Sequence, residues 1–219
     1  MKTNCIIFPH IPKCGGTSLK KQFEESNLKV FFDYEFPPNS TQKYYNDLCE
    51  RRNKESSYVD FGGCDLVFGH FPISRYKQKK YTYITLLRSP VERAWSQYNY
   101  FKEIPEINLP VALVRYPIIS EIRKGNVNFL DFLKLNNMDS FYRNFLDSLD
   151  PSDYLLVGFS DKYDSFSLQL SEILNIKFDA NIRERKGSGN ILSEIDAANA
   201  QKLLKPEIEL FEDFKKHWY

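Results

Sequence analysis

Short apolar runs recur along the chain, separated by segments with the spacing of amphipathic helices. Residues 81–87 (YTYITLL) form the clearest run, which has strand length and is rich in β-branched and aromatic residues. Similar runs lie at residues 5–8, 29–32, 65–68 and 154–159. Because strands that alternate with helices assemble into mainly parallel sheets, the pattern predicts an α/β fold with a mainly parallel central sheet flanked by helices.

The strongest helix signal follows the 81–87 run. Residues 89–92 (SPVE) have the form of a capping box, with proline at the first helical position. The segment then has one apolar face, formed by Val91, Ala94, Trp95 and Tyr98. Further helices are predicted at 17–26, after residue 159 through 174, and at 206–218.

Two segments, residues 35–58 and 103–127, interrupt this alternation. Both are too long for simple connections, so we expect functional loops or lids there. At 219 residues the chain has room for one hydrophobic core rather than two, and we expect a single domain over residues 1–219.

Composition narrows the class of protein only slightly. The 42% hydrophobic and 27% charged residues are typical of a globular protein in water, and the 16% aromatic residues indicate either stacking surfaces for bases and sugars or a bulky core. A net charge of +1 gives no overall field for nucleic acid, so we expect no nucleic-acid partner. No apolar run reaches the length of a membrane span, and we expect none.

The cysteines do not form a metal pattern. Their spacing, together with that of the three histidines, matches no zinc site. We interpret them as free thiols, which are typical of the reducing cytosol, and therefore expect a cytoplasmic protein. The four are Cys5, Cys14, Cys49 and Cys64.

Residues 12–18 (PKCGGTS) connect the first predicted strand to the first predicted helix. The two glycines let backbone N–H groups approach an anion, and the helix N-terminus adds the positive end of its dipole. Lys13 supplies a mobile charge, and the hydroxyls of Thr17 and Ser18 can donate to phosphate oxygens. The loop is not a nucleoside-triphosphate P-loop, because its lysine precedes the glycines. The segment indicates an anion site, or else a glycine turn with a solvated lysine.

Residues 10–18 (HIPKCGGTS) resemble the 5′-phosphosulfate loop of the carbohydrate sulfotransferases, in which a form such as HIPKTGGTS is typical. That family also has an arginine followed eight residues later by a serine at a strand-to-helix junction, and Arg88 and Ser96 match this element. The resemblance is closest to the branch that contains heparan sulfate 2-O-sulfotransferase. It covers residues 5–32 and 64–102 well.

This resemblance implies a sulfotransferase with a P-loop-like fold. It would move a sulfuryl group from its co-substrate, 3′-phosphoadenosine 5′-phosphosulfate (PAPS), to a hydroxyl of an acceptor, which we expect to be a glycan. Segments 35–58 and 103–127 would lie on the acceptor side. A late basic segment would close over the 3′-phosphate and adenine, or is a solvated charge run. The implied nucleotide contacts are Lys13, Cys14, Gly15, Gly16, Thr17, Ser18, Arg88, Ser96, Arg185, Lys186 and Gly187.

Two residues depart from the family pattern. Cys14 replaces the usual threonine and removes one hydroxyl donor, while Ser89 replaces the usual aspartate and can still cap the helix. Because Cys14 lies beside Lys13 at a predicted helix N-terminus, we expect a lowered thiol pKa and high reactivity there.

His70 follows the 65–68 run, at the sheet edge where ligands of open α/β sheets bind. An imidazole that titrates near neutrality suits removal of a proton from an attacking hydroxyl. The resembling branch has its general base in such a Gly-His pair, which implies the same role for His70; a capping or core histidine is the alternative. His10 is expected to fix the shape of the loop, and Asp33 or Glu35 is the reserve base.

Lys13 is expected to stabilise the charge that develops on the bridging oxygen, by analogy with phosphoryl transfer. PAPS carries no β- and γ-phosphate pair for a metal to bridge, so we expect no required metal. Two other functions stay open. A small-molecule kinase of the P-loop type is disfavoured by the position of the lysine, and the presence of His70 together with Lys13 counts against a non-catalytic nucleotide-binding module.

Overall fold

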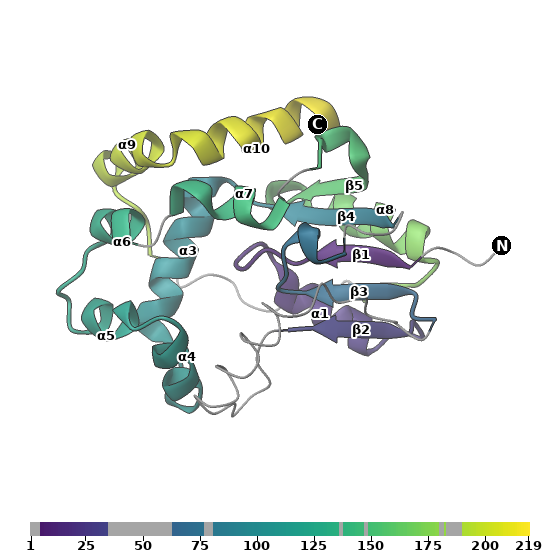
Figure 1. Ribbon diagram of the computed structural model, residues 1–219, viewed down its shortest axis with the longest axis horizontal. Coiled ribbons are helices and arrows are strands. Elements are labelled where there is room, and N and C mark those ends of the chain that lie inside the picture. Colours follow the sequence, from purple (N-terminus) through teal and green to yellow (C-terminus); the bar gives the residue numbers. More distant parts are fainter. Residues whose placement is uncertain are drawn as a thin grey trace.

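The protein has a parallel sheet at its centre (Figure 1). The computed structural model describes residues 5–34, 63–76, 81–135, 138–146, 149–179, 182 and 190–219. Within these residues five strands pair in parallel in the order β2-β3-β1-β4-β5. They are β1 (Ile6–Pro9), β2 (Val30–Asp33), β3 (Leu66–Gly69), β4 (Thr82–Leu87) and β5 (Tyr154–Phe159). The predicted mainly parallel α/β fold is confirmed.

The helices flank this sheet and extend beyond one end of it (Figure 1). The α-helices are α1 (Gly16–Glu24), α3 (Pro90–Glu103), α4 (Leu109–Arg115), α5 (Ile118–Arg123), α6 (Phe129–Leu135), α7 (Phe141–Leu146), α8 (Tyr163–Leu174), α9 (Glu194–Leu203) and α10 (Lys205–Trp218). Short 3-10 helices lie at η1 (Ile73–Tyr76), η2 (Glu106–Asn108), η3 (Met138–Ser140), η4 (Pro151–Asp153) and η5 (Ser160–Lys162). None of these described helices is long and apolar enough to cross a membrane.

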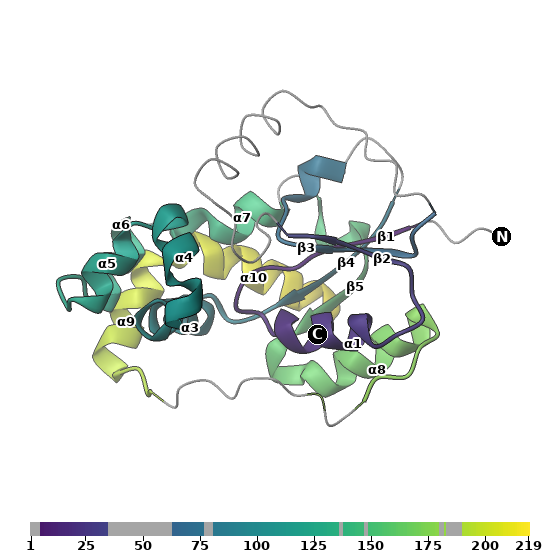
Figure 2. The same ribbon diagram turned by 90° about the horizontal axis from the view of Figure 1, so that it is seen from below.

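The two faces of the sheet are covered by different helices. Successive strand residues point to opposite faces, so Phe8 packs with α1 and α8 while its neighbour Ile7 packs with α7 and α10. Figure 2 shows α1 and α8 together on one face. Both faces carry fully buried side chains, which fixes the strand register because a slip of one residue would exchange the two faces.

The carboxyl ends of the central strands meet at one edge. The register pairs both Pro9 and Asp33 with Gly69, so His10 and His70 leave neighbouring strands side by side. Strand β1 leads through α1 to β2 on one side of the sheet, whereas β4 and β5 lie on its other side. Such a switch point in an open α/β sheet is where ligands bind.

A separate apolar cluster joins α3 to α4, α5, α6 and α9 beyond the sheet (Figure 1). The prediction of a loop over 103–127 was wrong, because this segment holds the end of α3, the 3-10 helix η2 and the helices α4 and α5. Ile119 and Ile122 are buried three residues apart, which is helical spacing. Helices of six and seven residues are too short to show that period clearly in the sequence. The other expected loop, 35–58, lies outside the described residues.

The start of α3 agrees with the sequence in position but not in detail. Ser89 is the N-cap and Pro90 the first helical residue, yet the Ser89 side chain makes no capping hydrogen bond. The capping box is therefore absent. The Glu92 carboxylate pairs instead with the Arg88 guanidinium, with 3.2 Å between Oε2 and Nε.

Candidate functional site

The loop between β1 and α1 is tightly wound. Lys13 and Gly15 both adopt positive φ, at 73° and 84°, and the Cys14 N–H donates to the Ile11 carbonyl at 3.2 Å. Gly15 is the N-cap of α1 and offers no side-chain oxygen to the first N–H groups of the helix. Those N–H groups have no partner within the helix, which leaves them available to an anion.

Gly16 is required by the packing of this loop. A Cβ at Gly16 would lie 1.7 Å from Nε2 of His10, so no larger residue fits while the imidazole stays in place. The His10 ring is 8% exposed, and its Nε2 has no hydrogen-bond partner among the described residues. A buried nitrogen without a partner therefore faces the first residue of α1. This arrangement fits an anion-binding loop.

Lys13 and Cys14 point in different directions. The Lys13 ammonium lies over the ring of Tyr100 from α3, 4.4 Å from its centroid. The Cys14 side chain is fully buried, with Sγ 3.7 Å from the Tyr142 hydroxyl. Burial raises the pKa of the Cys14 thiol to about 11, although the nearby Arg93 charge lowers it. The prediction of a lowered pKa for the Cys14 thiol was wrong. The side chain points into the core, so only the backbone of Cys14 can contact a ligand of the loop.

Arg88 stands at the end of β4, where its main chain is fixed by a distant side chain. The Tyr142 hydroxyl accepts from the Arg88 N–H at 3.2 Å and donates to the Arg88 carbonyl. Since the same hydroxyl contacts Cys14, it ties the β1–α1 loop to the end of β4. Ser96 lies in the second turn of α3 and is partly buried.

The two sequence-predicted histidines touch at the same edge. Nε2 of the His70 ring lies 3.1 Å from Nδ1 of His10. The backbone N–H of His70 donates to the Asp33 carbonyl at 3.0 Å. Tyr34 packs against His70, with 4.8 Å between ring centroids. The structure therefore places His70 next to a residue that contacts the glycine loop.

Asp33, the reserve base, is already engaged. Its carboxylate accepts from the Tyr76 hydroxyl at 2.5 Å and pairs with Arg75 at 3.1 Å. The carboxylate is buried and holds η1 against the end of β2. This arrangement favours a structural role for Asp33.

A model of the Sulfotransferase family matches residues 1–173. The chain belongs to the sulfotransferase family.

Solved structures also match the chain, at low sequence identity. A sulfotransferase from Alicyclobacillus acidocaldarius is 13% identical with a TM-score of 0.47, over 97% of this chain and 95% of that one. A mouse sulfotransferase complexed with PAP is 15% identical with a TM-score of 0.37, over 91% of this chain and 63% of that one. Retinol dehydratase in a complex with retinol and PAP is 16% identical with a TM-score of 0.34, over 97% and 67%. This chain thus spans about two thirds of the length of the two proteins bound to PAP. No curated protein matches the sequence.

The motifs shared with the sulfotransferase family predict only some of the residues at this candidate site. Arg185, Lys186, Gly187 and Glu35 lie outside the described residues. Tyr34 and Tyr142 were not expected, and their sequence surroundings carry no signal, because each acts on a residue distant in the chain. Among the described residues, no group of three or more histidine, cysteine and acidic side chains could hold a metal ion, and the expectation of no required metal stays a prediction.

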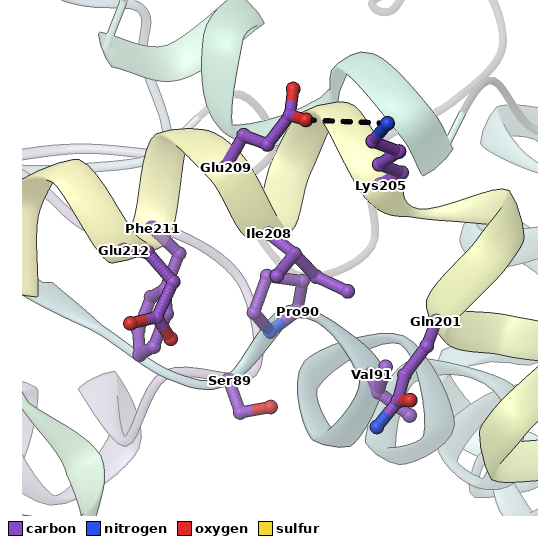
Figure 3. Close-up of a pocket in the computed structure, with 9 residues that line it drawn as sticks. All are labelled: Ser89, Pro90, Val91, Gln201, Lys205, Ile208, Glu209, Phe211 and Glu212. Carbon is purple, nitrogen blue, oxygen red and sulfur yellow. Dashed lines mark ion pairs between the residues drawn. The ribbon is translucent and has the colours of Figure 1, made fainter.

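The protein also has a pocket of about 410 Å³, which lies between the start of α3 and the helices α9 and α10 (Figure 3). In Figure 3, Ile208 lies beside Pro90, while Lys205 and Glu209 form an ion pair on the other side of α10. No residue of the described β1–α1 loop lines this pocket. Its lining is Ser89, Pro90, Val91, Gln201, Lys205, Ile208, Glu209, Phe211 and Glu212.

Proposed function

We propose that this chain is a sulfotransferase that moves a sulfuryl group from PAPS to a hydroxyl of a carbohydrate acceptor. One observation carries the proposal: His70 contacts His10, and His10 packs against Gly16 in the β1–α1 loop. The proposed proton acceptor and the proposed anion-binding loop are thus separated by a single residue, His10. The family match to residues 1–173 supports the transfer of a sulfuryl group, and the sequence resemblance supports the carbohydrate.

The nucleotide would be held at two places along one sheet edge. The 5′-phosphosulfate would lie at the N-terminus of α1, against the N–H groups of Gly15, Gly16 and Thr17 and the hydroxyls of Thr17 and Ser18. The 3′-phosphate would contact Arg88 and Ser96. Arg185, Lys186 and Gly187 would close over the same phosphate and the adenine. All of these nucleotide contacts would come from a single domain over residues 1–219.

Chemistry at the sulfur needs a base and a charge stabiliser. The acceptor oxygen would form a bond to sulfur as the bond from sulfur to the bridging oxygen of PAPS breaks. His70 would take the proton of the acceptor hydroxyl, and the Lys13 ammonium would stabilise the charge left on the bridging oxygen. Most of the acceleration would come from positioning and charge stabilisation, as in phosphoryl transfer.

The acceptor would enter from the side of α4 and α5. Segment 103–127 folds into these helices, and segment 35–58 would complete the acceptor side. The aromatic side chain that the structure describes next to Lys13 is Tyr100, whose ring could stack on a ligand. Stacking on an aromatic ring suits a sugar, which supports a glycan as the acceptor class.

The test is sulfate transfer from labelled PAPS across a panel of glycans, with and without a chelator. We expect the wild-type protein to transfer sulfate in both conditions. His70→Ala is expected to slow transfer by about a hundred- to ten-thousand-fold while PAP affinity in calorimetry changes little. His217→Ala, an exposed histidine of α10, is the matched control and should behave as wild type. Stabilisation by ATP with magnesium but not by PAP would favour a kinase, and PAP binding without any transfer would favour a non-catalytic module.

A further inference from the structure

His10 is held in a single orientation by contacts from three directions. Its backbone N–H donates to the Gly69 carbonyl at 2.7 Å, and its ring stacks on Phe68 with 5.2 Å between centroids and 5° between planes. The Nε2 edge lies against Gly16. The ring therefore cannot turn without displacing β3 or the first turn of α1.

The opposite edge of this ring meets His70 and Tyr34. Nδ1 of His10 lies 3.1 Å from Nε2 of His70 and 3.3 Å from the Tyr34 hydroxyl. When two imidazoles share one hydrogen bond, one donates and the other accepts. The proton position on the first ring then fixes the tautomer of the second.

We infer that His10 is a positioning residue for His70: Nδ1 of His10 accepts from Nε2–H of His70, so that the lone pair of His70 lies on Nδ1 and takes the acceptor proton. In this tautomer His10 carries its own proton on Nε2, next to Gly16. That edge faces the loop where negative charge is expected, and an N–H is favoured there over a lone pair.

His10 supports His70 without competing for the proton. Burial, together with the nearby Lys13 charge, lowers the pKa of His10 to about 3. Burial raises the pKa of Tyr34, so its hydroxyl stays protonated. Two further charges are described beside Tyr34: the Lys20 ammonium, 5.3 Å from the centroid of the Tyr34 ring, and the Glu24 carboxylate, which pairs with Lys20 at 3.4 Å. The transferred proton thus stays on His70, and the hydrogen bond to His10 stabilises the imidazolium that forms.

The role of this pair in turnover rests on the proposed function, but the tautomers can be measured without it. The chain has only three histidines, His10, His70 and His217, so nitrogen-15 NMR of histidine-labelled wild-type protein gives a small set of ring signals. At pH 8 we expect His70 and His10 to carry their protons on Nε2. A proton on Nδ1 of His70, or exchange between its two tautomers, would overturn the inference. His10→Asn and His217→Asn variants assign the signals.

Turnover by two variants of His10 provides the second measurement. His10→Asn keeps an acceptor oxygen at the position of Nδ1, and we expect kcat within about threefold of wild type, whereas His10→Leu should lose about ten- to a hundred-fold. KM for the acceptor should stay within about twofold in both variants. PAP affinity should fall to the same extent in both, because both remove the Nε2–H that faces the loop. The acid limb of the rate profile should move to lower pH in His10→Leu, because the His70 imidazolium loses its hydrogen-bond acceptor.

The outcomes separate the two proposals. Equal loss in His10→Asn and His10→Leu, or an unmoved acid limb, would show that His10 only supports the fold. If His10→Leu does not fold, His10→Asn and the wild-type NMR spectrum still decide the question. If wild-type protein transfers no sulfate to any acceptor, the proposed function fails while the tautomer measurement stands on its own.

Discussion

The Tyr142 hydroxyl bridges the two main-chain groups of Arg88, accepting from its N–H at 3.2 Å and donating to its carbonyl. The two residues are 54 positions apart in the chain. Tyr142 is itself held from α10, because the Glu207 carboxylate accepts from its backbone N–H at 2.6 Å. The position of Arg88 therefore depends on a helix from the C-terminal part of the protein.

Tyr142→Phe should weaken PAP binding although residue 142 is not expected to touch the nucleotide. Loss of the hydroxyl removes the Tyr142 partner of two partly buried main-chain groups of Arg88, which lowers the free energy of unfolding by about 1–3 kcal/mol. We expect PAP affinity in calorimetry to fall by about three- to ten-fold as Arg88 shifts, which corresponds to about 0.6–1.4 kcal/mol. Tyr98→Phe is the matched control, because its buried hydroxyl donates to the Val127 carbonyl at 3.0 Å, away from the loop. Unchanged PAP affinity in Tyr142→Phe would separate this tyrosine from the site.

Arg88→Ala should discriminate between nucleotides. Charge-assisted hydrogen bonds contribute about 1.5–3 kcal/mol each, so PAP affinity should fall roughly ten- to a hundred-fold. Affinity for adenosine 5′-phosphate, which lacks the 3′-phosphate, should hardly change. Lys124→Ala removes the same charge from an exposed position at the C-terminal end of α5 and should leave both affinities unaltered. Equal wild-type affinity for the two nucleotides would contradict a 3′-phosphate site at Arg88.

Gly16→Ala should disrupt the loop and the histidine pair together. The new Cβ would overlap the His10 ring, and relief of such a clash costs about 1–3 kcal/mol of folding free energy. We expect a lower urea midpoint together with lost PAP binding. Gly125→Ala is the comparison, since Gly125 has a φ of 81° but open space around its Cβ position. That variant should lose stability only, through backbone strain of about 1 kcal/mol.

Alkylation should proceed slowly at Cys14. The thiol is fully buried with its pKa raised to about 11, whereas Cys5 and Cys64 are partly exposed, although burial raises their pKa values too. Iodoacetamide at pH 8, followed by peptide mass spectrometry, should label Cys14 last of these three. Urea should abolish the difference. Labelling of Cys14 ahead of the others in folded protein would place its thiol in the anion loop after all.

The buried His10 should make the protein less stable in acid. Its pKa is lowered from the ordinary value near 6.5 to about 3, so between these pH values the unfolded chain binds a proton that the folded chain does not. The free energy of unfolding from this group is therefore highest above about pH 6.5 and falls by up to about 1.4 kcal/mol per pH unit below it. Urea titrations at pH 7, 6 and 5 should show a smaller slope in His10→Asn and the wild-type slope in His217→Asn.

The sequence was most informative where local pattern decides structure. The run at 81–87 is apolar on both faces because β4 is buried between two layers, and the loop at 12–18 has glycines where the turn and the His10 contact need them. The orientation of Cys14 was not predictable, because it depends on a positive φ at Lys13, which lysine seldom adopts. Tyr142 was missed because its partner is 54 residues away. The helices α4 and α5 were missed because tertiary contacts with α3, rather than a long sequence period, stabilise them.

The sheet and the apolar cluster around α3 place different structural constraints on amino-acid substitutions. Substitutions near the sheet must preserve strand register and the turns that leave its edge, whereas those in α4, α5, α6 and α9 need only keep their contact with α3. Helix α3 belongs to both parts, since it begins beside Arg88 and carries Ser96, while Ala94, Tyr98 and Phe101 of the same helix are buried in the cluster. Insertions and exchanges of side chains can accumulate around one half of the molecule while the other half stays fixed. With α4 and α5 on the proposed acceptor side, relatives of this fold could change their acceptors without rebuilding the strands and turns at the sheet edge.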